Sequence, residues 1–592
     1  MERKNIDNSY KWNLSHIYKN EEEFKSDIQK IKELTKNLIS SKKDMFKTGS
    51  NFLKLLKLQD EISITINRLY VYSYLFYCEN TTNDKAGKLI SEITNISQDI
   101  NEKTFDIDNS IIKISDEVYE KLLSEEDGLL EYKQTLKVVR RFKNHTLEDD
   151  KEEIFVKSSD FSSIFSDAYD SLTTSDITFD KIEHNGEKLD FNESLWGKYC
   201  QNNDRDLRKK AYESLYKSYK AVKHTAYDLY KGHLKSEKFY SKTHEFNSTL
   251  ENALYANNIS TDIYNNLINS VNKNLDKIQS YFTMKKEFLG LEKLNMFDVY
   301  MPMCFLPDET FEFEKSKIIV KDSLKILGEE YHKALCNTID SDIIDVYPSD
   351  NKMTGAFCYA TYTTHPYVLL NHNDNFNSLS TLAHEIGHAM HSYFSNKYRN
   401  YTDSKYPIFT AEIASIVNEV ILNDYMVKNS NNDKLKKYIL GSMIEKIEGS
   451  LFRQIMFAEF EKEMHENIDK NIPITVEDVC NYYGNLVEKY HGPSVNIDEN
   501  IKHEWIRISH FYSSFYVYQY ATGICIAINI ANEIISGNEI MKKNYIDFLK
   551  SGSFDYPLNL IAKLGIDLSD DTLYDETCEY FGNLIKEFNN LK

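Results

Sequence analysis

The sequence has 592 residues, and its composition is that of a folded protein rich in helices. Hydrophobic residues make up 41% of it, which excludes a disordered chain, and its 19 glycines and 8 prolines are too few for a sandwich or a barrel. A formal net charge of −21 argues against nucleic acid or an anionic membrane as a partner. The first residues lack a secretory signal, no apolar stretch can cross a bilayer, and the 8 cysteines are scattered singly. We therefore expect a mostly helical, cytoplasmic protein with reduced thiols.

Taken in chain order, residues 1–170 show the apolar spacing of successive amphipathic helices. The pattern then changes, and short alternating strands flank Asn185-Gly186, a dipeptide typical of a tight hairpin turn. Helical spacing resumes near residue 195. We predict an N-terminal helical domain over residues 1–200, with a β-hairpin near residues 177–191, and a second domain over residues 201–592.

The second domain contains another region of strand-like sequence. Strands are predicted, in order, over residues 297–303, 343–347, 355–362 and 367–370. A helix is expected to begin near Asn375, and helical patterning continues from there to the C-terminal end. A small sheet therefore precedes this helix directly.

The predicted helix carries the motif His384-Glu385-Ile386-Gly387-His388. On a helix, His384 and His388 lie one turn apart on the same face, so both imidazoles can bind one metal ion. Glu385 projects beside them, where its carboxylate can accept a proton from a water bound to that metal. Two surface histidines without a metal are the alternative, but the motif lies in an apolar helix that follows strands. We predict one zinc ion per chain, although cobalt and manganese suit such ligands too.

A catalytic zinc needs a third protein ligand. Glu412 and Glu419 lie seven residues apart, and so on one face of an otherwise apolar helix. Buried carboxylates need a compensating cation, so this face is expected to meet the metal. Glu412 is the predicted third ligand, and Glu419 is predicted to orient a ligand histidine, with an ion pair to Lys or Arg as the alternative. His391 is predicted to lie behind the ligands, because a site of three histidines would leave Glu412 unexplained.

A segment dense in phenol groups follows His510. Peptide hydrolysis develops negative charge on the carbonyl oxygen, and a neutral Tyr or His donor commonly stabilises it. We predict His510 and Tyr518 as such donors, with Tyr512 next. Tyr516 and Tyr520 are predicted to be packing residues or part of a channel wall.

Sequence blocks along nearly the whole chain are similar to those of one family. They are Trp12-Asn13-Leu14, Asn203-Asp204-Arg205, Gly355-Ala356-Phe357, residues 384–394, residues 408–419 and residues 510–523. With these blocks the sequence resembles oligoendopeptidase F, in the thimet-oligopeptidase family of zinc metallopeptidases. The resemblance implies His384, His388 and Glu412 as zinc ligands and Glu385 as the catalytic carboxylate. It also implies a two-lobed, mostly helical, zincin-like fold with a deep substrate channel, and short peptides as substrates.

The expected function is therefore that of a cytoplasmic zinc endopeptidase acting on oligopeptides. One of the predicted strands 355–362 and 367–370 would pair with the extended substrate backbone. Two alternatives are a zinc carboxypeptidase of similar helical shape and a peptide-binding protein without catalytic activity. The sequence leaves the oligomeric state open.

Overall fold

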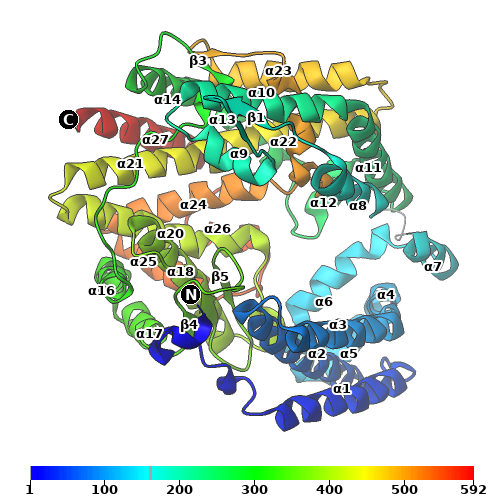
Figure 1. Cartoon of the computed structure of the whole chain (residues 1–592). Helices are drawn as coiled ribbons and strands as arrows, with labels where there is room; N and C mark the ends of the chain where they lie inside the picture. The colour runs from blue at the N-terminus through cyan, green and yellow to red at the C-terminus, as the bar shows by residue number, and fades with distance from the viewer. Residues whose placement is uncertain (1, 159–162, 592) are drawn as a thin grey trace. The chain divides into compact units, whose positions relative to one another are not determined.

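The computed structural model describes residues 2–158 and 163–591, and it is mostly helical with small sheets (Figure 1). The chain forms two compact units, each assembled from three separate stretches. The first unit comprises residues 1–146, 308–429 and 527–566, and the second comprises residues 147–307, 430–526 and 567–592. The domain division at residue 200 stays a prediction.

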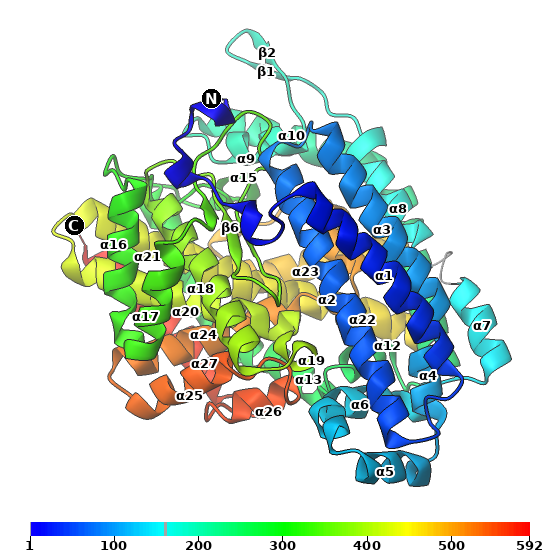
Figure 2. The same cartoon turned by 90° about the horizontal axis from the view of Figure 1, so that it is seen from below.

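The first unit contains the predicted metal motif. Its helices and strands are α1 (Glu21–Lys42), α2 (Gly49–Glu79), α3 (Asp84–Thr104), α4 (Asp106–Lys113), α5 (Asp116–Glu125), α6 (Lys133–Arg140), α16 (Phe313–Ser323), α17 (Glu329–Ile339), β4 (Ile344–Asp345), β5 (Phe357–Tyr359), β6 (Tyr367–Leu369), α18 (Phe376–Tyr398), α19 (Tyr401–Ser404), α20 (Ile408–Asn429), α25 (Glu539–Leu549) and α26 (Pro557–Ala562). Figure 2 shows α18 and α20 next to each other, with α16 and α17 beside them.

The second unit contains the phenol-rich segment. Its helices and strands are α7 (Asp149–Ser158), α8 (Ile164–Ser171), β1 (Ile182–His184), β2 (Glu187–Leu189), α9 (Glu193–Cys200), α10 (Arg205–Ala221), α11 (Lys223–Thr243), α12 (Thr249–Tyr255), α13 (Thr261–Lys273), α14 (Leu275–Phe288), β3 (Leu294–Asn295), α15 (Met296–Val299), α21 (Asp433–Ile447), α22 (Arg453–Asp469), α23 (Val476–His491), β7 (Val495–Asn496) and α27 (Thr572–Asn590). Helix α24 (Tyr518–Ile535) begins in the second unit and ends in the first.

The small sheet beside the metal motif has three strands in the order β4-β6-β5. Strand β6 pairs in parallel with β4 and antiparallel with β5, so β6 is interior and β5 lies at an edge. Helix α18 follows β6 after a short loop, and the side chain of Asn375 caps its first turn by accepting from the Ser378 N–H. The predicted order of sheet and helix is confirmed.

The predicted strand over residues 297–303 is wrong. Strand β3 ends at Asn295, and helix α15 follows directly. Asn295 and Asp298 form a capping box, in which each side chain accepts from the other's backbone N–H. This local pair of hydrogen bonds begins a helix despite the strand-like composition of the segment.

The hairpin around Asn185-Gly186 is present in the second unit, where β1 and β2 pair antiparallel. Both turn residues have positive φ, 50° for Asn185 and 82° for Gly186, as a tight two-residue turn requires. Within the described residues, we find no helix whose length and hydropathy would let it span a bilayer.

Candidate metal centre

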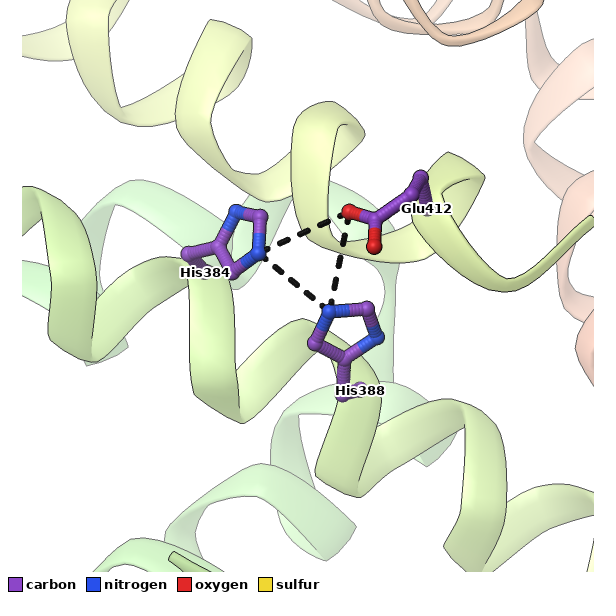
Figure 3. A group of neighbouring side chains, drawn as sticks. All are labelled: His384, His388 and Glu412. Carbon is purple, nitrogen blue, oxygen red and sulfur yellow. Dashed lines mark hydrogen bonds and ion pairs between the residues drawn. The ribbon is translucent and has the colours of Figure 1, made fainter. Parts of the chain in front are cut away.

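Three donor atoms converge in the first unit, from His384 and His388 on α18 and from Glu412 on α20 (Figure 3). The two Nε2 atoms are 3.2 Å apart. The Glu412 Oε2 atom lies 3.6 Å from Nε2 of His384 and 3.7 Å from Nε2 of His388. Ligand atoms about 2.0–2.2 Å from a tetrahedral ion are separated by about 3.4 Å, so these three donors fit a zinc-sized ion.

The hydrogen bonds around the two imidazoles also fit a bound cation. His384 donates from Nδ1 to Oε1 of Glu419 at 2.6 Å, which leaves a lone pair on Nε2. The His388 ring hydrogen-bonds to the backbone of Ala411. Burial lowers the pKa of His388 to about 4, helped by the neighbouring His384, so its ring is neutral near pH 7. Neutral imidazoles beside a carboxylate are the form that binds a metal.

Glu385 is buried next to these three donor residues, with only 6% of its surface exposed. Its Oε2 atom has no hydrogen-bond partner within the described part of the chain. Burial raises the pKa of Glu385 to about 7, and the neighbouring carboxylates of Glu412 and Glu419 add to this shift. A carboxylate whose pKa lies near neutrality can both accept and return a proton.

His391 lies on α18 but away from the three converging donors. Its ring is 1% exposed and stacks on Tyr406, with ring centroids 3.8 Å apart. Burial lowers its pKa to about 3. His391 is therefore a neutral packing group that lies away from the three donor atoms.

Gly387 lets α18 and α20 approach closely, which sequence reasoning did not recognise. A Cβ atom there would lie 2.5 Å from the Ser415 Cα and 2.7 Å from the Ala414 carbonyl oxygen. Asn418 adds a second tie between the helices, because its Nδ2 donates to the Ala383 carbonyl at 3.1 Å. The small residue within the motif was the signal that could have indicated this close packing.

Gly387→Ala is expected to separate α18 from α20 and to weaken metal binding. The added methyl group contacts backbone atoms that cannot yield, and such overpacking costs about 1–3 kcal/mol of unfolding free energy. Zinc titration against a competing chelator, with thermal unfolding of both metal states, would measure the effect. Gly197→Ala is the control, since a Cβ at Gly197 meets nothing within 4 Å. Unchanged zinc affinity in Gly387→Ala would contradict this role.

Glu419→Gln is expected to lower zinc affinity roughly 10–100-fold, because it removes the charge that orients His384 and raises its basicity. Glu419 is 7% exposed, so solvent cannot replace the lost charge. A chelator competition would measure the affinity. Asp424→Asn, which removes a half-buried carboxylate paired with Lys428 on the same helix, is the control. If zinc affinity fell equally in both variants, the fall would come from the loss of negative charge in general and not from the contact of Glu419 with His384.

The phenol-rich segment lies in the second unit, and its members differ in exposure. Tyr518 is 2% exposed and its ring packs edge-on against Tyr264. Tyr512 stacks on Tyr169 with centroids 4.3 Å apart, and its buried hydroxyl lacks a hydrogen-bond partner among the described residues. Burial raises the pKa of both phenols.

His510 instead forms a half-buried cluster with Tyr516 and Tyr520. The rings of His510 and Tyr516 are parallel, with centroids 6.1 Å apart, and Tyr520 meets both edge-on. The Tyr520 hydroxyl lies 3.4 Å from that of Tyr516. Both tyrosines were predicted to be packing or wall residues, and their proximity to His510 was not expected.

The chain was compared with known families and structures. The model of peptidase family M3 matches residues 198–580, and a model described as oligopeptidase F matches residues 110–179. Oligopeptidase PepF of Bacillus subtilis is 32% identical over 98% of this chain and 87% of its own, and the oligoendopeptidase F homolog of Borreliella burgdorferi is 34% identical over 100% and 99%.

Solved structures agree with this result. A crystal structure from Chlamydophila abortus matches with a TM-score of 0.92 at 32% identity, covering 100% of both chains. Oligoendopeptidase-F from Enterococcus faecium matches with a TM-score of 0.76 at 28% identity, covering 96% of this chain and 99% of its own. The family model and the relatives together show a metalloendopeptidase. The chain belongs to peptidase family M3, as the resemblance to oligoendopeptidase F predicted.

Proposed function

We propose that this protein is a zinc-dependent endopeptidase that cleaves internal bonds of short oligopeptides. One zinc ion per chain would be held by His384, His388 and Glu412. The observation that carries the proposal is the convergence of these three donors beside the buried carboxylate of Glu385, whose Oε2 atom has no hydrogen-bond partner among the described residues. The names of the relatives, oligopeptidase and oligoendopeptidase, support the choice of substrate. The cytoplasmic location stays a prediction.

When bound, zinc supplies a Lewis acid that lowers the pKa of water and polarises the scissile carbonyl. Glu385 accepts the proton of the attacking water and later returns it to the leaving amine. Its pKa of about 7, raised mainly by burial, suits both steps. Glu419 holds His384 in the tautomer that offers Nε2 to the ion.

Strand β5 is the candidate for pairing with an extended substrate. Of the two strands considered from the sequence, β6 is flanked by β4 and β5, so its backbone groups are already used. Strand β5 is an edge strand and contacts the metal helix α18. An edge strand offers unpaired N–H and C=O groups to an added peptide strand.

We propose His510 as the donor that stabilises charge on the carbonyl oxygen, together with one tyrosine of the same segment. Tyr518 was our first choice from the sequence. The half-buried position of Tyr516 beside His510 favours Tyr516, because the buried Tyr518 ring packs against Tyr264.

Tyr516→Phe is expected to lower kcat about 10–100-fold with little change in KM, because the lost hydroxyl acts only in the transition state. Tyr518→Phe is expected to leave kcat within about threefold of wild type. Steady-state kinetics on one fluorogenic peptide would measure both variants, which are matched in the group removed. A larger fall of kcat in Tyr518→Phe would return the donor role to Tyr518.

The proposed function itself is tested by mapping the products of a mixed set of short peptides by mass spectrometry. Wild type should produce internal cleavages, and Glu385→Gln with zinc bound should produce none. Removal of terminal residues alone would favour the carboxypeptidase alternative. Absence of any cleavage by zinc-loaded wild type would contradict the proposal and favour peptide binding.

A further inference from the structure

A strained backbone lies in the middle of the phenol-rich segment. The chain leaves a short 3-10 helix (Ser509–Tyr512), passes through Phe515 and enters α24 at Tyr518. Phe515 has a φ of 55°, in the left-handed region that a bulky aromatic residue rarely adopts. Strained residues persist only where their surroundings hold them, and they cluster at functional sites. We therefore asked what holds Phe515.

Glu461 of α22 holds the backbone of Phe515 directly. Its Oε1 atom accepts a hydrogen bond from the Phe515 N–H at 2.7 Å, and its side chain is 0% exposed. Its Oε2 atom has no hydrogen-bond partner, and no ion pair of Glu461 is found, among the described residues. Burial raises the pKa of this carboxyl well above its usual range. The backbone of Phe515 is thus the one hydrogen-bond partner that the described structure gives to a deeply buried acid.

Two residues of α11 hold the preceding residue, Ser514. The Nε2 atom of His233 lies 3.1 Å from the Ser514 Oγ, and Glu237 hydrogen-bonds to the same side chain. The Phe515 ring packs on His465, with centroids 4.4 Å apart. Buried polar groups from two helices therefore fix this turn within the second unit.

Stability alone is a poor explanation for Glu461. A buried acid without a cation is costly, and an apolar residue of similar volume would pack there at lower cost. The arrangement instead fixes the directions in which the chain leaves Phe515. His510 lies on one side of it, and Tyr516 follows it directly.

We propose that Glu461 is a positioning residue for the peptidase reaction. By accepting the Phe515 N–H it holds the turn that places His510 and Tyr516 for the substrate. This inference rests on the proposed function, in which that segment stabilises charge on the carbonyl oxygen.

The test compares Glu461→Gln, Glu461→Asp and Glu461→Leu. Gln keeps an acceptor at the same distance and should stay within about threefold of wild type. Leu removes the acceptor and should lower kcat about 10–100-fold with KM changed less than about threefold, because the loss falls on the transition state. Asp retracts the acceptor by one methylene and should fall between them. Glu466→Leu is the control, since Glu466 lies on the same helix but pairs with Lys470 near the surface.

Two further readouts separate positioning from a general loss of structure. A phosphinic peptide, which imitates the tetrahedral geometry, should bind Glu461→Leu more weakly by the factor lost in kcat/KM. Hydrogen exchange of peptides covering residues 509–518 should accelerate in Glu461→Leu and not in Glu461→Gln. Bound zinc and exchange elsewhere should not change.

The outcomes are distinct. If wild type cleaves peptides and Glu461→Leu keeps its kcat, or if Glu461→Gln is as impaired as Glu461→Leu, the positioning role is wrong. If Glu461→Leu fails to fold, a wild-type kcat in Glu461→Asp contradicts the proposal in the same way. If zinc-loaded wild type cleaves nothing, the proposed function fails first.

Discussion

Glu385→Gln is expected to keep its zinc and to lower kcat by roughly 10²–10⁴-fold, the range that general acid–base catalysis contributes. The amide has the shape of the carboxylate but cannot accept a proton at neutral pH. Glu385 is not one of the three converging donors, so the ion should remain bound. Zinc content by elemental analysis and kcat on one fluorogenic peptide would be measured on the same preparation.

Asp424→Asn is the matched control for Glu385→Gln, because it also replaces an acid by its amide within the first unit. The control should retain both zinc and activity. Wild-type turnover in zinc-loaded Glu385→Gln would remove Glu385 from its proposed role. Loss of zinc in that variant would instead make Glu385 part of the metal centre.

Glu412→Ala is expected to lower zinc affinity by more than the roughly 10–100-fold expected for Glu419→Gln, because it removes a proposed ligand itself rather than the partner of a proposed ligand. The two remaining Nε2 atoms, 3.2 Å apart, cannot form a closed site alone. Activity should fall with zinc content. Excess zinc should restore part of it.

Chelator competition on both glutamate variants would establish this order of affinities. If Glu412→Ala kept full zinc content and Glu419→Gln lost it, the two roles would be exchanged. If neither variant changed zinc affinity, zinc would bind at another site. His384, His388 and Glu412 would then form only a hydrogen-bonded cluster.

The histidine half of the candidate metal centre could be predicted from sequence because its geometry is local. Helical spacing alone places His384 and His388 on one face. The apolar helix around Glu412 indicates that its carboxylate needs a compensating cation. The close approach that brings Glu412 to the histidines depends on contacts of Gly387 with another helix, which the spacing does not reveal.

Other features had no local signature. The strand predicted over residues 297–303 failed because hydrogen bonds between Asn295 and Asp298 outweigh composition. The left-handed conformation of Phe515, between Tyr512 and Tyr516, is another feature that periodicity cannot predict. The sequence of helix α22 does not distinguish Glu461 from its neighbours. Its role is indicated only by its burial and by its hydrogen bond with the Phe515 N–H.

The discontinuous make-up of the two units has a consequence for synthesis of the chain. The first unit needs residues from the N-terminal stretch and from residues 527–566, and the second needs residues up to its last helix, α27. Neither unit can therefore be completed on the ribosome until most of the chain has emerged. Helix α18, for example, contacts α25, which is translated more than a hundred residues later. During that interval the nascent chain exposes apolar surface, and we expect it to depend on chaperones that bind such surface.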